Sequence, residues 1–273
     1  MSSILAVIAH RSSCRTFDGR PLSPAERFSV EGLLTGPAVG PFGNRVRFML
    51  LDVSPAAPGT ARLGTYGVIR DAPCFLAGAV AAGRGALEDF AFAFERVVLG
   101  LTAMGLATCW LAGSYRRSAF VDRLELADGE VLPAVSPVGH PAARPSLTDA
   151  IMRAGAGSAR RRPWEALFSF GRKEAGAWEP CLEAVRLGPS ATNAQPWRIA
   201  KEPGLPVFHL AIAGPAAARS KRRLDAGIAM CHFELAAGEL GLAGRWNAPG
   251  TLPGAGRPVL PRGTVHVATW ICA

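Results

Sequence analysis

Two pairs of similar segments recur in the same order in the two halves of the sequence. Residues 36–48 and 188–199 each follow an amphipathic helix pattern and lead into a strand pattern. Residues 104–110 (MGLATCW) and 240–246 (LGLAGRW) each end a long apolar helix pattern. The first pair lies 152 positions apart (188 − 36) and the second 136 (240 − 104), so the halves carry different insertions. Repeats of about 130 residues are too long for a solenoid, and they predict two copies of one α+β unit packed about a pseudo-twofold axis.

The composition excludes several classes of protein. Of the 273 residues, 49% are hydrophobic and 19% charged, which excludes a disordered chain, a coiled coil and a collagen-like rod. The net charge of +9 raises the possibility of a nucleic-acid or anionic-membrane partner. However, only three of the 30 basic residues are lysines, and the arginines are scattered except for a run at 160–162. We therefore expect neither a nucleic-acid nor a membrane partner.

The cysteines and the N-terminus bear on the cellular compartment. Six cysteines occur without a C-x-x-C pair, which predicts free thiols in a reducing cytoplasm. Residues 1–11 lack the basic and small-residue features of a signal peptide. Residues 97–115 carry no charge, but glycines and polar residues interrupt them, so we expect a buried helix, a turn at Gly105 and a strand instead of a membrane span.

Apolar periodicity and turn residues predict alternating helices and strands. A capping box with proline at the first helical position, from Ser23 to Glu26, begins one helix. The Ala, Gly, Pro and Arg content of residues 141–163 predicts a linker between a first half, 1–140, and a second half, 164–273. We expect helices over 24–35, 86–104, 178–187 and 225–240, strands over 45–52, 73–80, 108–112, 206–212 and 264–272, an extended segment over 131–139, and a loop over 247–262.

Familiar catalytic signatures do not occur in the sequence. It has no G-x-S-x-G, P-loop or H-E-x-x-H motif, no metal-ligand spacing and no Rossmann fingerprint. The five histidines are isolated from one another, and His232 lies in an apolar helix pattern, which is typical of a core histidine with satisfied hydrogen bonds. We therefore expect no metal and no catalytic acid or base supplied by the protein.

Two polar segments are candidates for a binding site. Residues 10–17 (HRSSCRTF) place Ser12 and Ser13 between Arg11 and Arg15, whose guanidinium groups would face one way at a helix start. Guanidinium groups suit phosphates and planar polar edges, although an exposed basic turn would show the same residues. Residues 189–197 (PSATNAQPW) crowd four polar side chains between two prolines, as a rigid binding loop or a capped turn would.

Three motifs together resemble the FMN-dependent nitroreductase family, in the form in which two units are fused in one chain. They are R-x-S-x-R at 11–15, G-L-x-T-x-W-L-x-G at 105–113 and P-S-A-x-N-x-Q-P-W at 189–197, with further agreement at 64–69, 137–141, 163–168 and 225–230. The resemblance covers most of the chain. It implies an α+β, nitroreductase-like fold: two tandem α/β units, with antiparallel sheets flanked by helices, packed as an intramolecular pseudo-dimer.

The resemblance also implies a flavin site between the units. The phosphate and ribityl end would be held by the segment Arg11, Ser12, Ser13 and by Arg160 and Arg162 of the linker. Arg15 would face the pyrimidine edge of the ring, and the backbone of Ala112 and Gly113 would donate to flavin N5. The loop residues that would line the ring are Pro189, Ser190, Ala191 and Asn193.

One site of the two is expected to survive. The first half has Pro37, Ala38, Val39 and Gly40 where the polar loop belongs, and residues 168–173 of the second half lack the arginine–serine signature. The resemblance therefore implies one FMN per chain, bound by a monomer.

The implied activity is a ping-pong reduction of nitroaromatics, quinones or similar electron-poor small molecules by NADH or NADPH. The flavin would carry this chemistry. A flavin-binding or flavin-modifying protein that uses the same site is the alternative. A basic surface-binding protein would instead be colourless.

Overall fold

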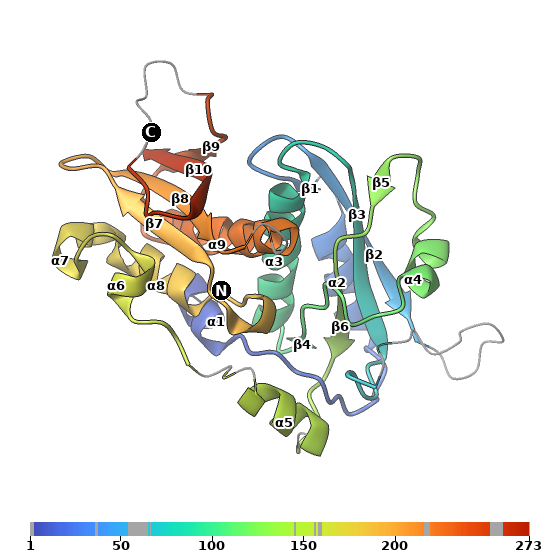
Figure 1. The fold of residues 1–273 in the computed structure, drawn as a ribbon. Coiled ribbons are helices and arrows are strands. Elements are labelled where there is room, and N and C mark those ends of the chain that lie inside the picture. The colour runs from blue at the N-terminus through green and yellow to red at the C-terminus, as the bar shows by residue number, and fades with distance from the viewer. Residues whose placement is uncertain are drawn as a thin grey trace.

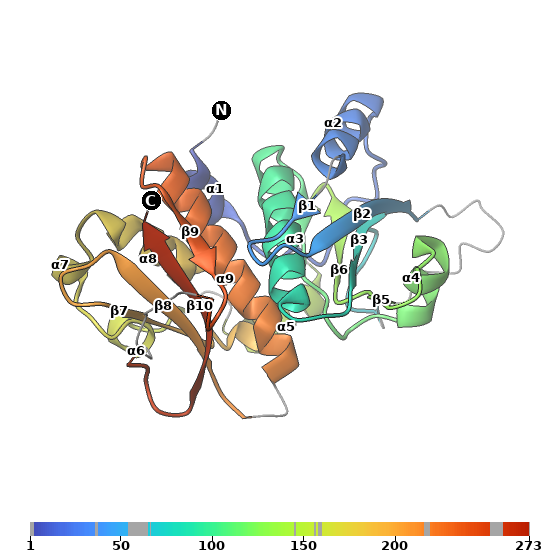
Figure 2. The same cartoon turned by 90° about the horizontal axis from the view of Figure 1, so that it is seen from above.

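The computed structural model describes residues 3–35, 38–53, 65, 67–144, 146–155, 157, 160–215, 219–251 and 259–272. Two β-sheets lie on opposite sides of a central helical layer, in which helices α3 and α9 pack side by side (Figures 1 and 2). Helices and antiparallel strand pairs make up both parts, which confirms the predicted α+β class.

The first half builds a six-stranded antiparallel sheet with the order β1-β2-β3-β6-β4, and β5 pairs with β3 beside this path. Its elements are α1 (Ile4–His10), α2 (Pro24–Leu34), β1 (Ala38–Val39), β2 (Arg45–Asp52), β3 (Cys74–Ala81), α3 (Ala86–Ala103), β4 (Ala107–Thr108), α4 (Arg117–Leu124), β5 (Glu130–Val131) and β6 (Val135–Gly139).

The second half builds a four-stranded antiparallel sheet with the order β7-β8-β10-β9. Its elements, with those of the preceding linker, are α5 (Leu147–Gly155), α6 (Trp164–Leu167), α7 (Arg172–Ala175), a 3-10 helix (Gly176–Trp178), α8 (Glu179–Leu187), a second 3-10 helix (Ala191–Asn193), β7 (Trp197–Lys201), β8 (Val207–Ala213), α9 (Arg219–Glu239), β9 (Gly244–Asn247) and β10 (Thr264–Cys272).

Corresponding segments take corresponding places in the two sheets. In chain order, β2, β3, α3, β4 and β6 of the first half parallel β7, β8, α9, β9 and β10 of the second. The sheet orders β2-β3-β6-β4 and β7-β8-β10-β9 therefore follow one scheme. The repeated segments at 104–110 and 240–246 both follow a central helix and turn through a glycine with positive φ, Gly105 (+78°) and Gly241 (+70°).

Helices α3 and α9 approach each other closely at Gly227. A Cβ at this position would lie 2.2 Å from the backbone oxygen of Glu88, so only glycine fits. A buried polar network crosses the same contact: Nε2 of His232 lies 2.8 Å from Oε1 of Glu95, and Nδ1 lies 2.8 Å from the carbonyl of Ala184. Trp110 donates to Oε2 of Glu95 at 2.6 Å. The prediction of a satisfied core histidine is confirmed.

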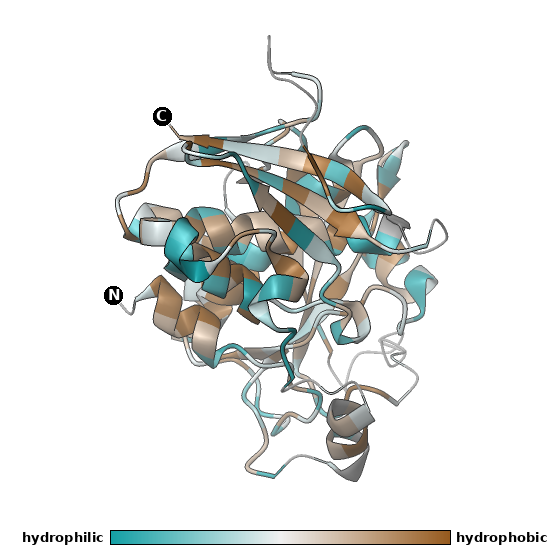
Figure 3. Cartoon of the chain, turned by 60° about the vertical axis from the view of Figure 1, so that its left-hand side comes forward, coloured by the Kyte–Doolittle hydropathy of each residue, from teal (hydrophilic) through white to brown (hydrophobic). Residues whose placement is uncertain are grey.

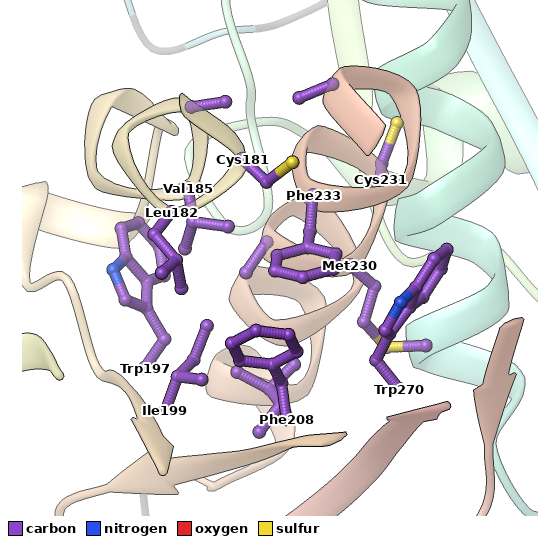
Figure 4. Close-up of a cluster of buried hydrophobic side chains, with 14 of the residues drawn as sticks. Cys181, Leu182, Val185, Trp197, Ile199, Phe208, Met230, Cys231, Phe233 and Trp270 are labelled. Atoms are coloured by element: carbon purple, nitrogen blue, oxygen red, sulfur yellow. The ribbon is translucent and has the colours of Figure 1, made fainter. Parts of the chain in front are cut away.

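Aromatic packing fills the core of the second half. Figure 4 shows Phe233 reaching from α9 toward Phe208 on β8, and Met230 of the same helix beside Trp270. The helices beneath this sheet carry both hydrophobic and hydrophilic stretches, as amphipathic helices do (Figure 3). Cys74, Cys109, Cys181 and Cys231 are buried free thiols, and burial raises the pKa of the Cys181 thiol to about 12, so this thiol is an inert core group.

Several predicted elements are confirmed with small shifts. The strands over 45–52 and 264–272 have the predicted bounds, and Ser23 forms the predicted capping box with Glu26. The uncharged residues 97–115 form the end of a buried helix, a turn at Gly105 and a short strand, as predicted. No helix in the described ranges is long and apolar enough to cross a bilayer.

Other elements correct the sequence interpretation. Helix α9 begins at Arg219, six residues earlier than expected, because the basic residues of its first turns hide the apolar period. The linker contains helix α5, and strand β9 was not predicted. It overlaps the predicted loop 247–262 at Asn247 alone. Residues 248–251 and 259–262 form no helix or strand, as predicted, and residues 252–258 lie outside the described ranges. The strand expected over 108–112 shortens to Ala107–Thr108, with a separate bridge between Leu111 and Val135.

Candidate functional site

The N-terminal arginine segment lies along strand β4. The sequence interpretation placed this segment at a helix start, and that is wrong: Arg11 is the C-cap of α1, and its N–H donates to the carbonyl of Val7. The chain then runs extended, so that Ser13 bridges Thr108 in parallel and the N–H of Cys14 donates to the carbonyl of Thr108 at 2.9 Å. These contacts join the arginine segment, residues 11–15, to the segment 105–113. The resemblance assigns both segments to the first-half side of the site.

Arg11 and Arg161 bring two guanidinium groups into one buried region. Arg11 is only 9% exposed. Burial lowers its pKa, and the nearby Glu95 opposes that effect. Burial also lowers the pKa of Arg161, with further lowering by the charges of Arg11 and Arg186. Partly buried cations that repel one another form a region that favours an anionic ligand.

The polar loop of the second half has an unusual backbone. Thr192, Asn193 and Gln195 have φ values of +50°, +55° and +47°, a region that non-glycine residues seldom occupy. The loop is held by the Oγ of Ser190, which accepts from the N–H of Gln195 at 2.9 Å, and by Asp225, which accepts from the N–H of Ala191 at 2.9 Å. Strain of this kind persists where the surroundings fix it, and it is common at binding sites.

The linker packs against this loop. Asn193 donates through Nδ2 to the carbonyls of Gly157 (2.8 Å) and Arg160 (2.9 Å), and its Oδ1 accepts from Arg161 at 3.2 Å. Gln195 accepts from the N–H of Arg162 at 2.8 Å. The linker therefore joins the arginine segment of one half to the polar loop of the other.

Within the basic run, the middle residue is the one whose side chain enters the site. Arg160 and Arg162, the two residues that the resemblance suggested, have exposed side chains, and Nε of Arg162 donates to the carbonyl of Ala194 at 3.3 Å. Arg161 was missed. In an extended chain, alternate side chains point to opposite sides. Either Arg161 or its two neighbours could therefore face the site, and the spacing of the arginines does not show which.

Asp225 is a second residue that was not singled out. Its carboxyl group is 3% exposed, and burial raises its pKa to about 7. Oδ1 accepts from the polar loop, whereas Oδ2 has no hydrogen-bond partner among the described residues. In the sequence, the only signal for Asp225 was that it begins the segment 225–230, which agrees with the family pattern.

The segment after β4 meets the start of α9. A Cβ at Gly113 would lie 3.5 Å from Nζ of Lys221, which places this first-half glycine beside a second-half cation. Ala112 is half-buried. The predicted backbone donors therefore lie at the junction of the two halves.

Cavity size does not mark the site. A cavity of about 510 Å³ lies between α2 and α3, lined by Leu33, Val39, Phe92 and Arg96 among others, and it includes none of the predicted site residues. A smaller one of about 120 Å³ includes Ser12. The convergence of polar groups identifies the candidate site better than volume does.

The first-half loop that corresponds to the polar loop is hydrogen-bonded to a carboxylate of α3. Asp89 accepts from the N–H groups of Phe42 (2.9 Å) and Asn44 (2.8 Å) and from Nδ2 of Asn44 (2.8 Å). Phe168 and Phe170, at the start of the second half, are buried against Trp164. Buried aromatic side chains stand here where the first half has Arg11 and Arg15, and Arg172 stacks over the Trp164 ring at 4.3 Å.

Some buried polar atoms of the candidate site have no hydrogen-bond partner in the part of the chain that the structure describes, among them Nε of Arg11, Nε of Arg15 and Oδ2 of Asp225. Two donors and one acceptor suit a ligand with an anionic group and polar ring edges, as a flavin nucleotide has. No cluster of three or more His, Cys, Asp or Glu side chains that could bind a metal occurs within the described ranges.

Comparison with known proteins gives a family and a structural likeness over nearly the full chain. The family model described as "Putative TM nitroreductase" matches residues 3–237. A crystal structure described as a "putative nitroreductase" from Thermotoga maritima is 20% identical, with 99% of this chain and 93% of that chain covered and a TM-score of 0.63.

Shorter structures match about half of the chain. A nitroreductase with bound FMN from Desulfitobacterium hafniense is 22% identical and covers 53% of this chain and 93% of its own, with a TM-score of 0.38. A Parabacteroides distasonis protein described as a "Putative NADH dehydrogenase/NAD(P)H nitroreductase" is 19% identical and covers 54% and 92%, with a TM-score of 0.43. No curated protein sequence matches the chain.

Proposed function

The chain belongs to the TM nitroreductase family, and from this premise we propose that it is an FMN-dependent oxidoreductase that uses NADH or NADPH to reduce electron-poor small molecules such as nitroaromatics or quinones. One observation carries the proposal. Arg11 from the first half, Arg161 from the linker and Asn193 from the second half converge on one region. A flavin nucleotide bound there would touch all three parts of the chain.

The phosphate would bind at the arginine end of the site. Arg11 and Arg161 would form charge-assisted hydrogen bonds with it, and Ser12 and Ser13 supply hydroxyl groups nearby. Arg160 and Arg162 have exposed side chains, so in this proposal they attract the anion from the rim of the site.

The ring would lie between the two halves. Arg15 would face its pyrimidine edge, where a cation favours the negative charge that reduction adds. The residues Pro189, Ser190, Ala191 and Asn193 would line one side, in a conformation that their hydrogen bonds have already fixed. Ala112 and Gly113 lack polar side chains, so they would contribute only backbone N–H groups.

The cofactor would supply the redox chemistry, accepting hydride from NADH or NADPH and passing electrons to the acceptor. The chain's own part would be to bind, orient and shield. This division of work agrees with a site in which arginines, amides and hydroxyls converge.

We further propose that one chain acts as a pseudo-dimer, with 1–140 and 164–273 as its two units and 141–163 as a linker that takes part in the site. The shared strand order supports this arrangement. The three hydrogen bonds that tie residues 42 and 44 to Asp89 support a single flavin per chain, because they use both oxygens of this carboxylate. Buried free thiols such as Cys74, Cys181 and Cys231 are consistent with a cytoplasmic enzyme.

The visible spectrum of the purified protein, reconstituted with FMN and desalted, tests the proposal. We expect retained flavin absorbance, bleaching on anaerobic addition of NADH or NADPH, and recovery on addition of a nitroaromatic or a quinone. A protein that retains no FMN contradicts the proposal.

A flavin-binding or flavin-modifying protein is the second candidate. Ala112 favours it, because related reductases often have a glutamate at this position and alanine offers no carboxylate. In that case the protein would retain FMN, but neither nicotinamide cofactor would bleach it.

A further inference from the structure

Arg15 is paired with a carboxylate that belongs to the linker. Its Nη1 lies 3.1 Å from Oδ1 of Asp149, and the two side chains are 16% and 3% exposed. Asp149 lies in the first turn of α5. The residue proposed to face the flavin ring therefore has a buried counter-ion, and neither half supplies it.

The chain fixes Asp149 in this position. The Oγ of Ser146 accepts from the N–H of Asp149 at 3.2 Å, as a helix cap does. Ser146 is in turn bound to Thr16, with its N–H donating to Oγ1 of Thr16 and the two hydroxyl oxygens 3.0 Å apart. Helix α5 is thus attached to the residue next to Arg15.

The backbone of Arg15 is fixed independently of Asp149. Its carbonyl accepts from the N–H of Arg70 at 2.9 Å, and the N–H of Cys14 donates to Thr108 at 2.9 Å. The ionisable neighbour on the β4 side is Cys109, and burial raises the pKa of its thiol, which keeps it neutral. Asp149 is therefore the charge that opposes Arg15 at short range.

We propose that Asp149 is a positioning residue that acts through Arg15: it balances part of the guanidinium charge at the ring's pyrimidine edge and so lowers the redox potential of the bound flavin. The inference rests on the proposed function. Two opposite charges 3.1 Å apart in a poorly solvated site largely cancel at longer range. The negative charge of the reduced ring then gains less from Arg15 than it would from an unpaired guanidinium.

Asp149→Asn tests this directly, because it removes the charge and keeps an oxygen that can accept from Arg15. We expect FMN affinity to change less than threefold. We expect the reduced flavin to bind about tenfold more tightly relative to the oxidised form, which raises the midpoint potential by about 30 mV for a two-electron couple. Asp149→Ala should shift the potential in the same direction if the asparagine variant does not fold.

Two controls separate charge balance from other effects. Asp122→Asn makes the same change in net charge on α4, which lies apart from α5 in both views (Figures 1 and 2), and should leave the potential unchanged. In an Arg15→Gln background, Asp149→Asn should have no further effect on the potential, since its action passes through Arg15.

The outcomes are distinguishable. An unchanged potential in Asp149→Asn overturns the inference, and a lowered one does so too, because it would mean that Asp149 only holds Arg15 in place. If the wild-type protein binds no FMN, the proposed function is what has failed, and the inference falls with it.

Discussion

Asp89 on α3 and Asp225 on α9 hold corresponding loops of the two halves, but Asp89 accepts three hydrogen bonds and Asp225 accepts one. They lie 136 positions apart (225 − 89), the same spacing as the repeated segments that end these helices. In the first half, both carboxylate oxygens of Asp89 accept hydrogen bonds from the loop. In the second half, Asp225 keeps a spare carboxylate oxygen beside the polar residues proposed to line the flavin.

Asp225→Asn should make the protein more stable at neutral and alkaline pH. Burial raises the folded-state pKa to about 7, above the ordinary aspartate value of about 3.9. The native state therefore holds a proton that the unfolded chain has lost, and wild-type stability falls as pH rises between these values. The gain of the variant should grow by about 1.4 kcal/mol per pH unit from pH 4 to 7, then level off. Urea unfolding across this range measures it.

Asp89→Asn is the matched control. An amide has one acceptor oxygen for three N–H donors, so this variant should be less stable than wild type at pH 8, by about 1–3 kcal/mol. Equal effects of the two substitutions would contradict the different roles assigned to these aspartates.

Arg11→Ala and Arg161→Ala should each weaken FMN binding roughly 10- to 100-fold, because each loses a charge-assisted contact worth about 1.5–3 kcal/mol. Quenching of flavin fluorescence on titration measures the dissociation constant. Arg160→Ala, from the same basic run but with an exposed side chain, should have a much smaller effect. Full FMN content in dialysed Arg11→Ala would show that the phosphate lies elsewhere.

Arg15→Gln should leave FMN bound and lower its midpoint potential, because the reduced ring loses a nearby cation. Spectroelectrochemistry of the reconstituted variant gives the potential. An unchanged or higher value would reject the placement of Arg15 at the pyrimidine edge.

Gly227→Ala should destabilise the protein by about 1–3 kcal/mol, because the new Cβ would lie 2.2 Å from the Glu88 carbonyl, and backbone cannot move aside cheaply. Gly238→Ala on the same helix meets nothing within 4 Å and should be neutral or stabilising by up to about 1 kcal/mol. Thermal unfolding of the two variants compares them. Equal stability would mean that α3 and α9 pack less closely at this point.

Much of the fold could be predicted from local patterns. The strands over 45–52 and 264–272 have runs of apolar and β-branched residues, and the capping box at Ser23 specifies a helix start within four residues. Helix α5 was missed because the Ala, Gly, Pro and Arg content of residues 141–163 as a whole is typical of a linker. The nine residues of the helix themselves have an amphipathic pattern, which that composition hid.

The site was harder to predict, because its contacts join distant parts of the chain. The arginine and polar-loop motifs indicated which segments to examine. However, Asp149 pairs with a residue 134 positions away and Asp225 with a loop 34 positions away, and neither has a local sequence signal. The choice of Arg161 over its neighbours depends on how the linker lies against Asn193. Such pairings follow from tertiary packing.

The number of flavins per chain tests the central claim most directly. Light scattering and flavin absorbance recorded on the same elution peak give the mass of the particle and its FMN content together. We predict one FMN for each chain of 28.6 kDa, bound by a monomer, because a single chain supplies the arginine segment, the linker and the polar loop. Two flavins per chain, or flavin found only in a dimer, would contradict a single site formed between the two halves of one chain.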